Sequence, residues 1–138
     1  MKENWTLVRS ILTAAEEERL PAFVETASAD VKWLENQSIP DHLCGSQQEA
    51  LEFVINGHIQ LMMEIGALDG IAIVPVLGKG KLLKLSGARL TAQGHQILTA
   101  MRQPTTWNAI KSYAVQTGIG LTASTLQGIV QKVIQTVL

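Results

Sequence analysis

One short β-branched segment interrupts a chain whose other apolar residues recur mostly at helical spacing, and it constrains the fold more than any other feature. Residues 71–76 read Ile-Ala-Ile-Val-Pro-Val between Gly70 and Gly78, which predicts a strand. Pro75 has no N–H to donate, so it favours a sheet edge. Residues 78–80, Gly-Lys-Gly, form the expected turn, and residues 81–85 form the returning strand. The sequence therefore predicts a β-hairpin.

Helices are expected before this hairpin. Apolar residues recur at helical spacing from Trp5 to about Arg19, whereas residues 22–37, which follow a proline, have only moderate periodicity and allow a second, short helix. A third helix, residues 47–65, has a clear start signal. Ser46 and Glu49 match a capping box, in which each side chain satisfies a free backbone N–H, and the glycine at position 66 is typical of a helix end.

Further helices are expected after the hairpin. One runs from a threonine cap at position 91 through residue 102 and stops at Pro104. The next starts at one of the two following threonines and ends at Gly118. The last begins near Thr122 and has an apolar stripe at helical spacing: Leu126, Ile129, Val130, Val133, Ile134, Val137 and Leu138.

This order of elements predicts an α+β, mostly helical fold. Helices followed by a two-stranded hairpin wing are what a winged-helix-like core over residues 1–90 would give, and residues 91–138 would then form a C-terminal helical extension packed on it. The chain of 138 residues has the usual size of one domain, and no linker or repeat divides it.

The charges are distributed unevenly between the two halves of the chain. Residues 1–69 hold all 12 acidic residues against four basic ones, whereas residues 70–138 hold seven basic residues and no acidic one. The net charge of −1 is therefore the sum of −8 and +7. The basic half either binds an anionic partner, a nucleic acid or an acidic protein, or neutralises the acidic half by packing or by dimerisation.

No residue pattern points to catalysis, a cofactor or a metal. The three histidines, His42, His58 and His95, are widely spaced, and Cys44 is the only cysteine. We expect His58 and His95 to be structural. Nucleophile elbows and phosphate-binding loops are absent, so we expect a protein that is not an enzyme and has no cofactor.

The start of the chain lacks the apolar core of a secretory signal, and no apolar run approaches the roughly 20 residues that cross a bilayer. No internal disulfide can form from one cysteine, which suits a reducing compartment. These features predict a cytoplasmic protein with no membrane partner.

Three segments carry a resemblance to a known family. Residues 58–68 read His-Ile-Gln-Leu-Met-Met-Glu-Ile-Gly-Ala-Leu, residues 89–95 read Arg-Leu-Thr-Ala-Gln-Gly-His, and residues 100–108 contain Ala-Met-Arg and Thr-Trp-Asn. They resemble signature stretches of the bacterial and phage family called domain of unknown function 2513. The resemblance covers the first helix and most of residues 58–138. It implies a winged-helix-like fold in phage- or mobile-element-associated proteins and supplies no activity.

Two binding functions remain open. The first is an inhibitor, antitoxin or immunity-like module whose basic half meets an acidic protein. The second is a winged-helix DNA-binding regulator, although the helix at 47–65 has three glutamates and no Lys or Arg. Both hypotheses use the same basic residues: Lys79, Lys81, Lys84, Arg89 and Arg102. The apolar stripe of the last helix, including Val137, either docks on its own domain or forms a homodimer seam.

Overall fold

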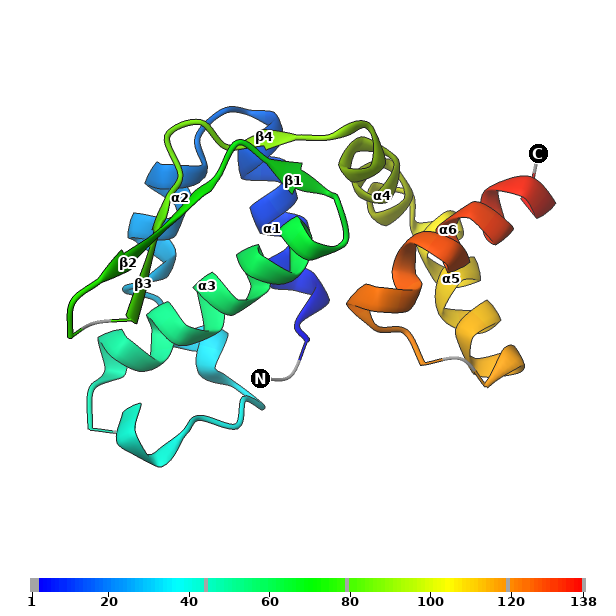
Figure 1. The fold of residues 1–138 in the computed structure, drawn as a ribbon. Coiled ribbons are helices and arrows are strands. Elements are labelled where there is room, and N and C mark those ends of the chain that lie inside the picture. The colour runs from blue at the N-terminus through cyan, green and yellow to red at the C-terminus, as the bar shows by residue number, and fades with distance from the viewer. Residues whose placement is uncertain (1–2, 44, 79, 119, 138) are drawn as a thin grey trace.

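The computed structural model describes residues 3–43, 45–78, 80–118 and 120–137. Helices dominate these residues, and short paired strands separate an N-terminal group of helices from a C-terminal group (Figure 1). The fold is thus mostly helical with a small hairpin sheet, as the sequence predicts. The elements, in chain order, are α1 (Trp5–Glu16), α2 (Leu20–Ala27), the 3₁₀ turns η1 (Val31–Leu34) and η2 (Asp41–Leu43), α3 (Gln47–Glu64), β1 (Leu68–Asp69), β2 (Ala72–Val76), β3 (Gly80–Lys84), β4 (Arg89–Leu90), α4 (Ala92–Arg102), α5 (Pro104–Thr117) and α6 (Ala123–Val137).

Helix α1 is the centre of the packing. Its apolar stripe is buried, and it packs against α2, α3, β4 and α4, so it touches both groups of helices. The Asn4 side chain caps its start by accepting a hydrogen bond from the Leu7 backbone N–H at 3.1 Å. The helix ends at Glu16, three residues before the predicted Arg19. Glu18 adopts a positive φ of 57° in the turn that leads to α2.

The first and second predicted helical segments differ from the structure in their boundaries. Helix α2 begins at Leu20, because Pro21 occupies the first turn of a helix, where its missing N–H has no helical partner to lose. It ends at Ala27, and the rest of the predicted segment contains only the single 3₁₀ turn η1, which packs against α3.

The start of α3 is as predicted. The Ser46 hydroxyl accepts a hydrogen bond from the Glu49 backbone N–H at 3.3 Å, which is the Ser46 half of the predicted capping box. The helix ends at Glu64, and Gly66 follows with a φ of +80°, the left-handed conformation expected after a helix end.

The strands form one long, bent ribbon. Strands β2 and β3 pair antiparallel with Ile73 opposite Leu83, which confirms the predicted hairpin. A second antiparallel pair, β1 with β4, extends the ribbon at its base and was not predicted. The two pairs meet where Gly70 faces Gly87: a Cβ on Gly70, which has a φ of +77°, would lie 2.0 Å from the Gly87 carbonyl oxygen. Only glycine permits this close approach.

The C-terminal helices follow the predicted pattern with one shift. Thr91 caps α4 by accepting a hydrogen bond from the Gly94 backbone N–H at 3.0 Å. Pro104 is the first residue of α5, where a proline fits, so α5 starts one or two residues before the threonines predicted to begin it. The helix ends before Gly118, which has a φ of +71°.

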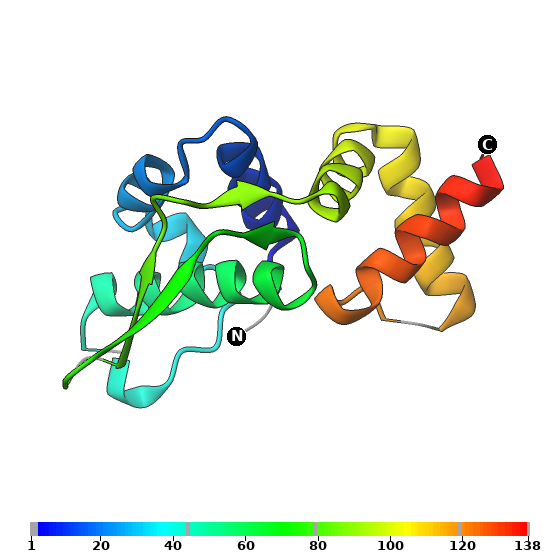
Figure 2. The ribbon, with the colours of Figure 1, turned by 45° about the horizontal axis from the view of Figure 1, so that its top comes forward.

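Helix α6 packs across α4 and α5, and Figure 2 shows these three helices as a group beside α1–α3. No helix in the described parts of the chain has the length and apolar character needed to span a lipid bilayer.

Candidate interaction surface

The hairpin places part of the predicted basic cluster on one strand. Lys84 is exposed on β3 opposite Ala72, and Lys81 lies on the same strand opposite Pro75. Among the described residues Lys84 has no carboxylate partner. The side chain of Lys81 and the whole of Lys79 lie outside what the structure describes. Lys84 is therefore the unpaired cation that can be located on the hairpin.

Arg89, in contrast, is paired inside the chain. It lies on β4 directly opposite Asp69 on β1, and its guanidinium donates through Nε and Nη2 to both carboxylate oxygens, the second at 3.2 Å. The hydrogen bond from Arg89 holds the pKa of Asp69 below its ordinary value. This fork-to-fork geometry ties the base of the ribbon and leaves Arg89 less able to bind an external anion.

Arg102 is also paired with the acidic half. Its guanidinium lies 2.8 Å from Glu16 at the end of α1, and the second oxygen of that carboxylate lies 3.6 Å from His95 Nδ1. Glu16 therefore connects two positions on α4 to α1. Arg89 with Asp69 and Arg102 with Glu16 are thus two places where the basic and acidic halves neutralise each other by packing, as one of the two alternatives expects.

The hairpin also exposes apolar side chains. Leu77 at the tip is fully exposed, Leu82 on β3 is 53% exposed, and Ile73 on β2 is 45% exposed. Leu82 lies opposite Val74, and cross-strand partners point to the same face of a sheet, so these two side chains form an apolar patch.

Lys84, two residues along β3 from Leu82, lies on that same face. Leu83 points to the other face and packs against the core. We call the surface formed by Val74, Leu77, Leu82 and Lys84 the hairpin surface.

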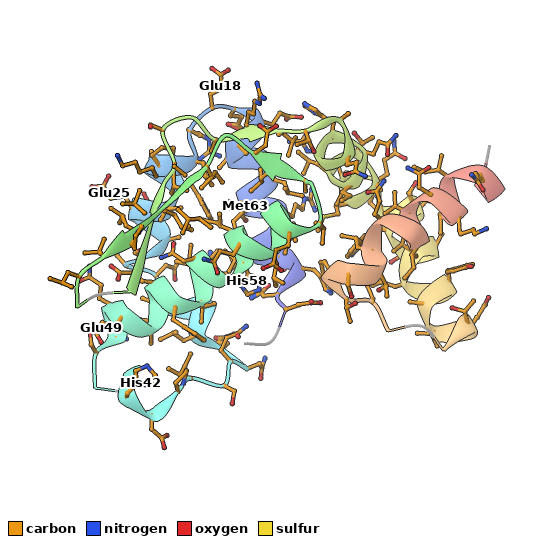
Figure 3. The ribbon with its side chains drawn as sticks, viewed as in Figure 1. Glu18, Glu25, His42, Glu49, His58 and Met63 are labelled. Atoms are coloured by element: carbon orange, nitrogen blue, oxygen red, sulfur yellow. The ribbon has the colours of Figure 1, made fainter. Side chains whose placement is uncertain are left out.

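Helix α3 does not offer the surface expected of a DNA-reading helix. Glu49, Glu52 and Glu64 are exposed, and the helix contains no Lys or Arg; Figure 3 shows Glu49 at its start. These carboxylates repel phosphates. The opposite side of α3 is buried in the core.

The apolar stripe of α6 faces its own chain. Leu126 and Val130 are completely buried, Ile129 and Val133 are nearly so, and Ile134 is half-buried against the core. The partners are α4 and α5. In this structure the described part of the stripe therefore docks on helices of its own chain. The side chain of Val137 lies outside what the structure describes.

The histidines have different environments. His58 is fully buried: its Nε2 accepts a hydrogen bond from the Asn4 backbone N–H at 2.9 Å, and its Nδ1 donates to the Val54 carbonyl oxygen at 2.7 Å. Burial lowers its pKa, which the hydrogen bond to Val54 partly opposes. His58 thus joins α3 to the start of α1 and is structural, as predicted (Figure 3). His95 is exposed beside Glu16.

A hollow that the sequence did not indicate lies between the C-terminal helices. It has a volume of about 420 Å³. Its wall combines the exposed edge of α4 with α5 and α6: His95, Gln96, Thr99, Ala100, Gln103, Thr106, Val133 and Ile134. Within the described residues, no three His, Cys, Asp or Glu side chains come close enough to hold a metal ion. Cys44 lies outside the described residues.

Fold and surface together define a small, mostly helical protein that presents one apolar and basic hairpin. A family model described as "Hypothetical protein (DUF2513)" matches residues 2–120, and the chain belongs to this family. The chain is also similar to an uncharacterized protein of Haemophilus influenzae, with 25% identity over 138 residues that cover all of this chain and 99% of the relative. No solved structure matches the chain significantly.

Proposed function

We propose that this protein is a non-enzymatic binding protein whose hairpin surface meets an acidic protein partner. The observation that carries the proposal is the exposed Leu82, two residues along β3 from Lys84, which has no carboxylate partner among the described residues; Leu77 is exposed at the tip of the same hairpin. Among the described residues outside the hairpin, the large apolar side chains are mainly buried, and Val31 and Val115 are exposed singly. Exposed apolar residues beside a charge are typical of a protein interface, with the apolar residues at its centre and the charge at its rim.

The proposal includes the winged-helix-like character of residues 1–90, with the hairpin as the wing. The order α1, α2, α3 and hairpin supports it. A role as an inhibitor, antitoxin or immunity-like protein of phage or mobile-element origin, acting in the cytoplasm, belongs to the same proposal. It is supported by the lack of catalytic patterns in the sequence.

Binding to DNA is the weaker alternative. Affinity for DNA comes largely from Lys and Arg side chains that neutralise phosphates. Here Arg89 and Arg102 hold carboxylates of the same chain, and α3 exposes glutamates. A protein partner needs fewer free cations and makes use of the apolar patch.

The test is capture of a partner from a nuclease-treated lysate of the source organism, followed by binding measurements with the purified partner. We expect Lys84→Glu and Leu82→Ser each to weaken binding by about tenfold. Lys111→Glu is the matched control, because Lys111 is an exposed lysine of the basic half on α5. If all three variants bind the partner as tightly as the wild-type chain does, the hairpin surface is not the interface. If the chain shifts duplex DNA with a steep salt dependence, the DNA alternative replaces the proposal.

A further inference from the structure

We propose that the partner binds by adding an extended, acidic segment as a third strand along the free edge of β3. This inference rests on the proposed function and specifies its geometry. Within the described residues β2 and β3 pair only with each other. Each strand therefore has one edge whose backbone N–H and C=O groups lack a strand partner, and such an edge is a template for strand addition.

The two edges are not equivalent. Strand β2 contains Pro75, which has no N–H and therefore interrupts any ladder that a third strand could form there. Strand β3 has no proline over Gly80–Lys84 and offers an unbroken backbone about 17 Å long. The free edge of β3 is the better template.

The charge on β3 selects the occupant. Lys81 and Lys84 both lie on this strand. A second copy that paired β3 with β3 would bring lysines together, and like charges on neighbouring strands are destabilising. An acidic segment would pair with them. The lysines thus disfavour self-association and favour an acidic strand.

Register then predicts the pattern of the added strand. Leu82 and Lys84 lie on one face, two residues apart. A strand beside them should carry an apolar residue next to Leu82 and an acidic residue two positions away, next to Lys84. The partner segment should therefore have an apolar and an acidic residue at positions i and i ± 2.

The experiment uses the full chain and an end-capped probe peptide of eight residues, two repeats of Val-Thr-Glu-Thr. Two further peptides carry N-methyl groups on one or the other alternating set of residues. In an added strand, one set points its N–H groups at β3 and the other points them at solvent. We expect one N-methylated peptide to bind at least about tenfold more weakly than the probe and the other to bind equally well. Hydrogen exchange of amides within Gly80–Lys84 should slow on addition of the probe.

The outcomes separate this inference from the proposed function. If both N-methylated peptides bind like the probe while Lys84→Glu weakens all three, the acidic partner stands and strand addition is overturned. If the probe fails to bind and Lys84→Glu also leaves partner capture unchanged, both are overturned. If the probe leaves hydrogen exchange at β3 unchanged while duplex DNA, or a higher concentration of the protein itself, slows it, the acidic strand is overturned. The occupant of the edge is then DNA or a second copy of the chain.

Discussion

Replacing Gly94 by alanine should destabilise the protein, although alanine is the better helix former. Gly94 is buried in the first turn of α4, where the chain crosses the end of α3. An added Cβ would lie 2.2 Å from the Ala67 carbonyl oxygen and 2.6 Å from Leu90 Cδ1. Leu90 can rotate away, but the carbonyl oxygen is backbone. It also accepts the Thr91 N–H hydrogen bond at 3.0 Å, so it cannot move without disturbing that bond.

The magnitude follows from this geometry. Helix α4 must retreat by about 0.8 Å, from 2.2 Å to the 3.0 Å below which real Cβ contacts essentially never fall. Overpacking of this kind costs about 1–3 kcal/mol, and the strained hydrogen bond contributes about 1 kcal/mol. The helix propensity of alanine returns about 0.5–1 kcal/mol. We expect Gly94→Ala to lower the free energy of unfolding by about 2 kcal/mol.

Gly128 supplies the matched control, because a Cβ there would meet nothing within 4 Å in the middle of α6. Gly128→Ala should raise the free energy of unfolding by about 0.5–1 kcal/mol. Urea unfolding followed by far-ultraviolet circular dichroism measures both variants against the wild type. The reasoning fails if Gly94→Ala has a transition midpoint at or above that of the wild type, or if both variants shift in the same direction.

Three further predictions concern individual contacts. Burial lowers the folded-state pKa of His58 below 6.5, so near this pH the unfolded chain binds more protons than the folded chain. The free energy of unfolding should therefore fall as the pH drops below 6.5, by at most about 1.4 kcal/mol per pH unit. Urea titrations at about pH 7.5 and 5.5 measure this slope, and His58→Gln should remove the part that His58 contributes. Arg102→Ala should cost less than about 1 kcal/mol because its pair with Glu16 is partly exposed, and a double-mutant cycle with Glu16→Gln should show the coupling vanish in 1 M salt. Thr91→Ala should cost about 1–2 kcal/mol in thermal unfolding because it removes the cap of α4, whereas Thr91→Ser should retain most of the stability.

Local signals account for the parts of the fold that the sequence predicts. Ser46, Thr91 and Gly118 act through hydrogen bonds or dihedral angles within a few residues of themselves, so a pattern in the sequence is enough to place them. The β1–β4 pair has no such signal. It is two residues long, and its register depends on the close approach of Gly70 to Gly87.

The candidate site shows the same division. The sequence identifies which side chains are basic, and it places Lys84 on the hairpin correctly. It cannot show that Arg102 lies against Glu16, because that contact depends on how α1 packs against α4. The exposure of Leu82 was also hidden, since an alternation of leucine and lysine does not reveal which face of a hairpin meets the core.

Basic residues of the second half include two groups: arginines that pair with carboxylates of the first half, and a hairpin lysine that is exposed. At the base of the ribbon Arg89 pairs with Asp69 and joins β4 to β1, and on α4 Arg102 pairs with Glu16 and joins the two groups of helices. On the hairpin, Lys84 has no such partner among the described residues and lies two residues along β3 from the exposed Leu82. Internal neutralisation therefore accounts for the arginines at 89 and 102, whereas the hairpin retains both charge and apolar area. This exposed charge and apolar area support the proposal that an acidic partner covers Leu82 and pairs with Lys84.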